Sequence, residues 1–320
     1  MSVCLTIISK LLNINILKKY NLFIYASILF FIYSVSVFGQ VTQDWVSRYN
    51  GPGSDMDWAF SVTVDGSGNV YVTGVSRSGT SSENGDYATI KYNTAGVQQW
   101  VARYNGPGNN TDWARSIKVD GSGNVYVTGY SYGSGTNKDY ATIKYNSAGV
   151  EQWVQRYNGP ANGRDEAYSL AVDGSGDVYV TRYSIGNGIL EDYATIKYNS
   201  AGVEEWVQRY NGPGNELDWA YSIAVDASSN VYVTGHSLGN GSNDDYATIK
   251  YNSAGVEEWV QRYNGPGNSI DRAYSIAVDA SGNVYVTGRS FGSGTGRDYA
   301  TIKYNSAGVE EWIERYNGPG

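Results

Sequence analysis

The chain has 320 residues and a formal net charge of −8, and it contains 40 glycines, 30 tyrosines and 9 tryptophans. This composition favours many short strands joined by glycine turns over helices. The acidic balance argues against a nucleic-acid partner or an anionic membrane surface, because both attract clustered Lys and Arg. With one cysteine, Cys4, and one histidine, His236, disulfides, thiolate metal sites and histidine-based zinc or catalytic sites in every repeat are excluded.

The first 39 residues have the pattern of a secretory signal peptide. Two lysines precede an apolar run over 22–38, and Val37 and Gly39 stand at the −3 and −1 positions before Gln40. An uncleaved anchor is the alternative, because a run of about 17 residues is at the lower limit for crossing a bilayer. We expect cleavage, which would place the mature chain in the secreted or cell-surface fraction without a membrane span.

The rest of the chain is an internal repeat. A tryptophan recurs after a first interval of 55 residues and then every 53, and Arg-Tyr-Asn-Gly-Pro follows each copy. Self-similarity at a fixed period predicts stacked supersecondary units. The repeated tryptophans are Trp45, Trp100, Trp153, Trp206, Trp259 and Trp312.

Each repeat is expected to form four antiparallel strands, which we name a to d. In the second repeat, 114–120, 124–129, 139–146 and 150–157 alternate apolar and polar residues between turn residues. A lone four-stranded sheet cannot bury both faces, so the copies must stack on one another. The predicted fold class is all-β: a β-propeller of about five full blades plus one extra N-terminal strand at 45–49. A sandwich or a solenoid is the alternative architecture.

The expected organisation is a signal peptide, 1–39, followed by a β-propeller repeat domain, 40–320. The lone strand d at the start, and an end at Gly320 in the middle of a repeated phrase, lead us to expect a truncated product. A surface-sorting tail would then lie beyond that end. The expected repeats span about 54–106, 107–159, 160–212, 213–265 and 266–320.

Two phrases of the repeat resemble a known family. Residues 119–129 read VDGSGNVYVTG and 139–145 read DYATIKY, and both resemble the SBBP repeat, named for a seven-bladed β-propeller. The match recurs over 43–320, and the first phrase is also similar to NHL-type propeller repeats. The resemblance implies a secreted or surface bacterial protein with a propeller fold. It implies no single activity, because the fold carries many.

The connections between strands are of two kinds. The a–b and c–d turns are nearly identical in all copies and are expected on one face, as scaffold. The b–c loops differ and are expected on the other face, where variation is typical of binding specificity or of neutral drift. His236, alone in one of these loops, is interpreted as an exposed residue without a role. The expected b–c loops are 75–85, 130–138, 183–191, 236–244 and 289–297.

One position near the start of strand a varies between copies. Three tryptophans there would form stacking platforms for sugar rings near the channel mouth, unless the position serves blade packing. Arg182, where the second repeat has Gly129, is another break in the symmetry. The ligand-binding candidates on the variable face are Trp58, Trp113, Trp219, Glu166, Arg272, Tyr132 and His236.

An aspartate opens strand a in every repeat. Five carboxylates around a channel mouth would be a weak candidate for a calcium ring. The favoured alternative is a local turn in which each Asp accepts hydrogen bonds from backbone amides. The Asp-Gly-Ser-Gly-Asn phrase, which lacks the closing Glu of a calcium loop, is likewise interpreted as a tight turn. We therefore predict no metal and no cofactor. The ring candidates are Asp57, Asp112, Asp165, Asp218 and Asp271.

The leading hypothesis for function is a secreted or cell-surface scaffold or interaction module that binds a glycan or another surface protein. A polysaccharide hydrolase or lyase with carboxylates at the channel mouth is the runner-up. Near-identical copies argue against an enzyme, because an active site breaks symmetry with unique residues. A purely structural surface protein is the third alternative.

Overall fold

The computed structural model describes residues 43–53, 55–77, 85–186, 190–241 and 243–318, so the predicted signal peptide lies outside the described residues. The repeat region from Trp45 onward is one compact unit. Within the described residues it contains 20 strands and no helix. They form five four-stranded sheets in which each strand pairs antiparallel with the next in sequence. The prediction of an all-β chain with four strands in each repeat is confirmed.

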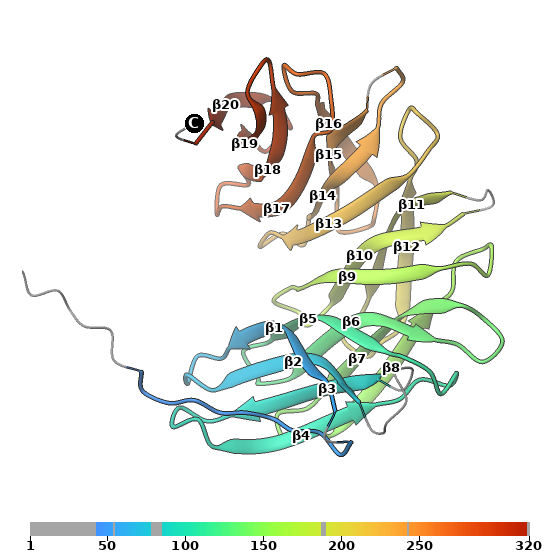
Figure 1. Cartoon of the computed structure of the whole chain (residues 1–320), viewed down its shortest axis with the longest axis vertical. Coiled ribbons are helices and arrows are strands. Elements are labelled where there is room, and N and C mark those ends of the chain that lie inside the picture. Colours follow the sequence, from blue (N-terminus) through green and yellow to red (C-terminus); the bar gives the residue numbers. More distant parts are fainter. Residues whose placement is uncertain (1–42, 54, 78–84, 187–189, 242, 319–320) are drawn as a thin grey trace, which may run out of the picture. The chain divides into compact units, whose positions relative to one another are not determined.

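Each sheet is one blade, and successive blades lie side by side (Figure 1). Blade 1 contains β1 (Asp57–Val64), β2 (Val70–Arg77), β3 (Gly85–Tyr92) and β4 (Gln98–Tyr104). Blade 2 contains β5 (Trp113–Val119), β6 (Val125–Tyr132), β7 (Lys138–Tyr145) and β8 (Glu151–Tyr157). Blade 3 contains β9 (Asp165–Val172), β10 (Val178–Ile185), β11 (Glu191–Tyr198) and β12 (Glu204–Tyr210). Blade 4 contains β13 (Asp218–Val225), β14 (Val231–Leu238), β15 (Asp244–Tyr251) and β16 (Glu257–Tyr263). Blade 5 contains β17 (Arg272–Val278), β18 (Val284–Gly292), β19 (Gly296–Tyr304) and β20 (Glu310–Tyr316).

The a–b turns are held by an aspartate that caps the backbone. Asp120 Oδ1 accepts the amides of Ser122 and Asn124, both at 2.9 Å, while its Oδ2 accepts the hydroxyl of Tyr126 at 3.0 Å. Burial opposes ionisation, but these hydrogen bonds prevail and hold the pKa of Asp120 below its usual value. The glycine that follows, Gly123, has φ of 79°, which a side chain disfavours. The phrase is a tight turn whose acceptors are occupied by its own residues.

Stacking of blades buries the apolar residues of strands b and c. Tyr126 and Tyr140 of blade 2 belong to one buried cluster with Leu170 and Val180 of blade 3. Their rings pack against residues of the neighbouring sheet, and the same arrangement recurs at the other boundaries between blades. The hydrophobic core is therefore divided into one layer between each pair of sheets, as stacking of identical units requires.

Strand d ties each blade together through an arginine. Arg156 Nη1 donates to Ser131 Oγ at 2.7 Å, and Nη2 donates to the Ser131 carbonyl and to Asp139 Oδ2, both at 2.8 Å. Nη1 also reaches the Tyr104 hydroxyl of the preceding blade at 3.1 Å. A planar fork of donors suits this set of acceptors, which explains why the repeated phrase carries Arg and not Lys.

Residues 45–49, expected as an extra strand, form no strand pairing, and that part of the prediction is wrong. The segment nevertheless occupies the place of a strand d preceding blade 1. Trp45 packs on Tyr92 with ring centroids 6.1 Å apart, and Tyr49 accepts a hydrogen bond from Arg103 Nη1 at 3.2 Å. Both contacts repeat those between later blades. A strand needs a hydrogen-bonded neighbour, and no strand c is present on that side among the described residues.

The two ends of the stack keep uncovered faces among the described residues. Tyr193, within the stack, is fully buried, whereas its equivalent in blade 5, Tyr299, is 69% exposed. At the other end Val62 of β1 is exposed, while its equivalent Ile117 is buried. Burial of the repeated side chains thus comes from a neighbouring blade and not from their own sheet.

The b–c connections are shorter than predicted. Strands b and c continue into the segments assigned to variable loops, as far as Tyr132 and from Lys138 in blade 2. In blade 4, β14 includes His236, so the histidine lies in a strand and not in a loop. The extension follows from cross-strand pairing: Ser237 and Asp245 are paired directly, which sequence alternation alone did not indicate.

Candidate functional site

Every strand a contains a β-bulge, which changes the direction of one side chain. In blade 1, Ala59 pairs with Gly74 and Ser61 pairs with Thr73, so Phe60 between them is unpaired. A bulge bends the strand and changes the direction of the extra side chain. Each strand a contacts the strand a of the next blade, so the five bulges form a row. The bulge residues are Phe60, Arg115, Tyr168, Tyr221 and Tyr274.

Three bulge residues make a tyrosine row on blades 3 to 5. The rings of Tyr168 and Tyr221 have centroids 6.1 Å apart, and those of Tyr221 and Tyr274 are 5.2 Å apart, both edge to face. Tyr168 is 42% exposed and Tyr274 is 43% exposed, so aromatic surface is available at both ends of the row. Sequence reasoning missed this row, although an aromatic residue three positions after the aspartate in four of the five repeats was a readable signal.

On blades 1 and 2 the aromatic residues pack against one another. Trp113 lies edge to face against Trp58 at 5.8 Å and stacks on Tyr130 at 5.9 Å between ring centroids. The guanidinium of Arg115 covers both Trp113 and Phe60 at 4.7 Å from each ring centroid. Trp58 remains exposed, whereas Trp113 is enclosed by neighbours.

Trp219, the third tryptophan candidate, is enclosed in blades 3 and 4. Its ring lies 5.3 Å from that of Tyr183 and 5.5 Å from that of His236. Its Nε1 donates to Glu191 Oε2 at 2.5 Å. The contacts of Trp219 with three neighbours fix the ring, so the structure does not bring the three tryptophans together as one platform.

Glu166 and Glu191 form a carboxylate pair bridged by Arg164. Lys138 Nζ donates to Glu166 Oε1 at 2.8 Å, and Arg164 Nη2 lies 3.1 Å from Glu191 Oε1. Burial alone raises the pKa of both groups, but Lys138 and Arg164 leave the pKa of Glu166 lowered. Burial prevails at Glu191, whose pKa is raised. Two neighbouring carboxylates thus have pKa values shifted in opposite directions, a pattern also found at catalytic sites.

Arg182 is the strongest break in the symmetry of the chain. Its side chain is 9% exposed, and its guanidinium carbon lies 4.3 Å from the ring centroid of Tyr221 and 4.6 Å from that of Tyr168. Tyr183 and Trp219 complete an aromatic enclosure at 5.3 and 5.1 Å. Nε and Nη1 have no hydrogen-bond partner among the described residues. A buried guanidinium with unused donors is costly unless something supplies an acceptor.

His236 is 2% exposed, so the expectation of an exposed residue without contacts is wrong. It pairs with Trp219 across the sheet and packs on Tyr221 at 5.5 Å between ring centroids. Burial, reinforced by the charges of Arg272, Arg182 and Arg289, lowers the pKa of His236 to about 3. The imidazole is therefore neutral at pH 7, and its Nδ1 has no hydrogen-bond partner in the described part of the chain.

Arg272, predicted as a ligand-binding candidate, is already paired. Its Nε donates to Asp244 Oδ2 at 2.6 Å, and its Nη2 lies 2.5 Å from the same oxygen. Arg289, paired across the sheet with Arg272, has no such carboxylate among the described residues, and its buried Nε has no partner there. Arg182 and Arg289 thus both have buried guanidinium nitrogen atoms and no ion pair with an acid in the described part of the chain.

The aspartates that open strand a are bound to backbone. Asp112 is fully buried, and its two oxygens accept the amides of Gly106 at 2.6 Å and Tyr132 at 3.1 Å. This places Tyr132 in the local turn of blade 2 through its main chain. Burial raises the pKa of Asp112, and at the equivalent Asp218 it raises the pKa to about 6. Backbone capping accounts for these carboxylates without a metal.

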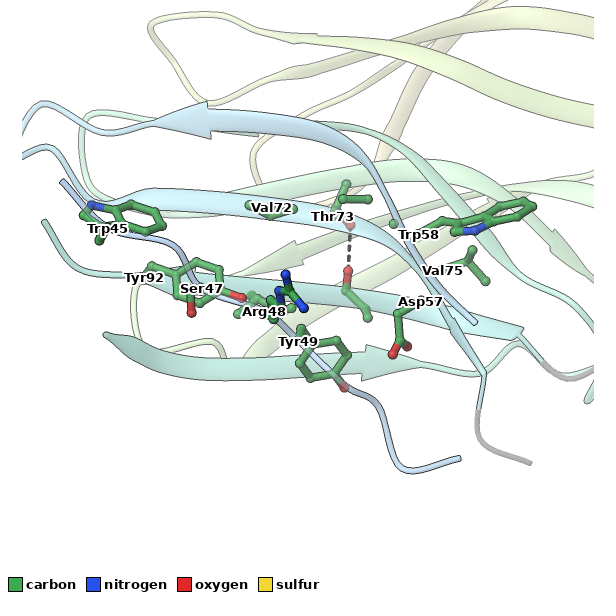
Figure 2. Close-up of a pocket in the computed structure, with 14 residues that line it drawn as sticks. Trp45, Ser47, Arg48, Tyr49, Asp57, Trp58, Val72, Thr73, Val75 and Tyr92 are labelled. Atoms are coloured by element: carbon green, nitrogen blue, oxygen red, sulfur yellow. Dashed lines mark hydrogen bonds between the residues drawn. The ribbon is translucent and has the colours of Figure 1, made fainter. Parts of the chain in front are cut away.

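A pocket of about 370 Å³ lies between residues 45–49 and the uncovered face of blade 1. Figure 2 shows Trp45 beside Tyr92 at one end and Tyr49 nearer to Asp57. Its lining includes Ala88 and Ile90. The equivalents of these two residues in later blades contact the tyrosines of a preceding blade. The pocket therefore combines a blade-packing surface with polar side chains, among them Arg48 and Asp57.

Two features are absent from the described residues. No group of three or more His, Cys, Asp or Glu side chains there is arranged to hold a metal ion. No helix there is long and apolar enough to cross a membrane.

Comparison with known proteins gives one family. The family model of the SBBP beta-propeller repeat matches residues 44–79, 99–135, 205–241 and 258–293. No curated protein is significantly similar in sequence.

Solved structures with a similar fold are distant in sequence. A eukaryotic initiation factor is 7% identical over 81% of this chain with a TM-score of 0.44, and the match covers 54% of that protein, about half its length. A protein of unknown function from Dyadobacter fermentans is 9% identical over 82% of this chain and 83% of its own, with a TM-score of 0.49. Regucalcin, a calcium-binding protein from Agrobacterium tumefaciens, is 13% identical over 82% and 75%, with a TM-score of 0.42.

Proposed function

Because the chain belongs to the SBBP beta-propeller repeat family, we propose that it is an exported interaction module whose ligand is a saccharide bound along the bulged strands a. The observation that carries the proposal is the tyrosine row of Tyr168, Tyr221 and Tyr274. Exposed aromatic rings with fixed orientation offer apolar faces to sugar rings at low entropic cost. Their hydroxyl groups add hydrogen bonds at the edges.

The geometry of the row supports a ligand longer than one sugar. The three tyrosines come from three different blades and are held by bulges in rigid strands, so their spacing does not depend on loop conformation. Trp58 and Phe60 expose further aromatic surface on blade 1. An extended chain of sugars would contact several blades at once, and each contact would add affinity.

The experiment is isothermal titration calorimetry of the protein with hexasaccharides of xylan, cellulose and polygalacturonate. Replacing both Tyr168 and Tyr274 with Ala should weaken binding about 5- to 150-fold, at roughly 0.5–1.5 kcal/mol for each ring. The matched control replaces Tyr299 and Tyr316, which are also exposed but lie on the outer face of blade 5. Absence of saturable binding to all three hexasaccharides would count against the proposal.

A polysaccharide hydrolase or lyase is the second candidate, and the carboxylate pair favours it. Glu191, with a raised pKa, would act as the general acid, and Glu166, with a lowered pKa, would remain ionised. Release of reducing ends from the bound polysaccharide, lost in Glu191→Gln with binding retained, would establish this activity. Binding without any release of reducing ends supports the interaction module.

A further inference from the structure

Blades 3 to 5 hold buried side-chain nitrogen atoms that form no hydrogen bond with any described residue. Arg182 is 9% exposed, and its Nε and Nη1 have no hydrogen-bond partner among the described residues. The Nδ1 of His236, at 2% exposed, is likewise without a partner there, as is the buried Nε of Arg289. Buried polar groups are normally satisfied by protein, water or a ligand, so three such residues together are unusual.

These donors share one neighbourhood. Arg182 and His236 both contact the rings of Tyr221 and Trp219. The charges of Arg182 and Arg289 both act on His236. Arg182 and His236 thus lie against the same two rings, and Arg289 lies close enough for its charge to act on His236.

The other charges nearby are already compensated. Asp244 pairs with Arg272, while Glu166 and Glu191 pair with Arg164. The charge of Arg182 acts to lower the pKa of Glu191, but the two side chains form no ion pair. The neighbourhood of Arg182 and Arg289 thus carries positive charge that no described carboxylate neutralises. An anion would satisfy both the charge and the unused donors, because charged hydrogen bonds to guanidinium are among the strongest available.

The sequence of the repeats shows that Arg182 is not demanded by the fold. The four equivalent positions are Gly74, Gly129, Gly235 and Gly288. A Cβ at Gly235 would approach the carbonyl oxygen of Trp219 to 1.9 Å, and the other three glycines are equally tight. Blade 3 places Arg182 at this crowded position, opposite Ala167, with the same bulge as the other blades. A residue that costs packing and leaves its own donors unsatisfied requires an explanation outside the fold.

We propose that Arg182, Arg289 and His236 form a subsite for the acidic group of an anionic saccharide, with the tyrosine row holding the sugar ring beside it. This rests on the proposed function and specifies the ligand class. Carboxylate and sulfate groups present the same pair of oxygens to a guanidinium. His236 Nε2 lies 3.8 Å from Asp244 Oδ2, so Nδ1 is the ring nitrogen open to the ligand, and it donates to the ligand in the tautomer protonated there.

The test is calorimetric titration with three hexasaccharides: hexagalacturonate, its uncharged methyl ester, and a κ-carrageenan hexasaccharide that carries sulfate. Wild-type protein should bind one or both anionic chains, and if it binds hexagalacturonate it should bind the methyl ester more weakly. Arg182→Gly restores the residue found in the other four blades, so it is expected to fold. It should weaken anionic binding about 10- to 100-fold, and weaken binding of the ester much less, through the lost contacts of Arg182 with Tyr168 and Tyr221 alone.

A matched control removes one positive charge at a position outside the proposed subsite. Lys118 is exposed at the far end of β5, and the equivalent positions in blades 3 to 5 are Ala171, Ala224 and Ala277. Lys118→Ala therefore removes one positive charge, installs the residue of other blades, and should leave affinity unchanged. Arg182→Lys retains the charge without the fork of donors and should recover part of the lost affinity.

The outcomes separate the subsite from the proposed function. Binding of hexagalacturonate alone identifies a carboxylate, and binding of the carrageenan chain alone identifies a sulfate. Equal affinity of wild type and Arg182→Gly, with binding still dependent on Tyr168 and Tyr274, overturns the subsite and leaves the saccharide proposal standing. No binding of any of these three hexasaccharides overturns the subsite, and the saccharide proposal is overturned as well if the xylan and cellulose hexasaccharides also fail to bind.

Discussion

Tyr193 of blade 3 donates its hydroxyl to the carbonyl of Ala247 in blade 4, at 3.3 Å, through a fully buried side chain. The bond crosses the boundary between two sheets that share no strand. The same pairing, always 54 residues apart, occurs at the other three boundaries, so one repeated tyrosine joins every blade to the next.

Removing this hydroxyl should destabilise the stack. In Tyr193→Phe the Ala247 carbonyl loses a buried donor, although Thr234 still donates to it at 3.3 Å. We expect a loss of about 1–2 kcal/mol in the free energy of unfolding, measured by urea denaturation. Tyr299→Phe is the control, because that side chain is 69% exposed, and it should change stability by less than about 0.5 kcal/mol. Equal effects of the two variants would contradict the prediction.

The arginine of strand d offers a second matched pair. Arg156→Lys retains the charge but cannot reach Ser131, Asp139 and Tyr104 together, so we expect a loss of about 2 kcal/mol in unfolding free energy. Arg48 has the same place in the repeated phrase but is exposed and forms no hydrogen bond among the described residues. Arg48→Lys should therefore leave the urea midpoint unchanged. A similar loss in both variants would show that the network contributes little.

The glycine opposite each bulge should not tolerate a side chain. In Gly235→Ala the new Cβ would meet the Trp219 carbonyl oxygen at 1.9 Å, and we expect destabilisation of about 2–4 kcal/mol. A Cβ added at Gly121, in the turn between β5 and β6, would have nothing within 4 Å, so Gly121→Ala should be nearly neutral. Thermal unfolding followed by circular dichroism compares the two. A stable Gly235→Ala protein would mean that the backbone yields easily, as it must around Arg182.

Stability should depend on pH through His236. Its pKa is about 3 in the folded chain and 6.5 when unfolded, so between these values the unfolded chain binds the extra proton. Stability from this group is complete above pH 6.5 and falls on acidification by up to about 1.4 kcal/mol per pH unit. His236→Tyr installs the residue of blades 2 and 3 and removes this dependence.

The comparison must be made as a difference between the two proteins. Asp218 has a folded pKa of about 6 against 3.8 unfolded, so its contribution changes in the opposite direction over the same range. Both proteins contain Asp218, so it cancels. We expect the stability of wild type relative to His236→Tyr, from urea denaturation at pH 4, 5, 6 and 7, to fall as the pH is lowered. A constant difference would show that the pKa of His236 is the same in the folded and unfolded chains.

The repeat, the strand order and the family were predictable because they depend on local pattern. Alternation of Val125 and Val127 with Tyr126 and Thr128 determines a two-sided strand, and the fixed period determines the stacking of copies. The Asp120 turn also follows from its own five residues. The sequence did not predict that β14 extends to Leu238. Ser237 pairs with Asp245 across the sheet, but the glycine-rich sequence between them shows no strand alternation.

Sequence alone therefore determined that this chain is a stack of near-identical antiparallel sheets, and it marked Glu166, Arg182, Arg272 and His236 as departures from the repeat. Only the tertiary structure decided what those departures do. Bulges direct the tyrosines of three blades into one row, and stacking encloses Arg182 in rings from two blades while Asp244 compensates Arg272. The physical reason is that burial and charge compensation depend on the neighbouring blade, about 50 residues away in sequence, and periodicity says nothing about such neighbours.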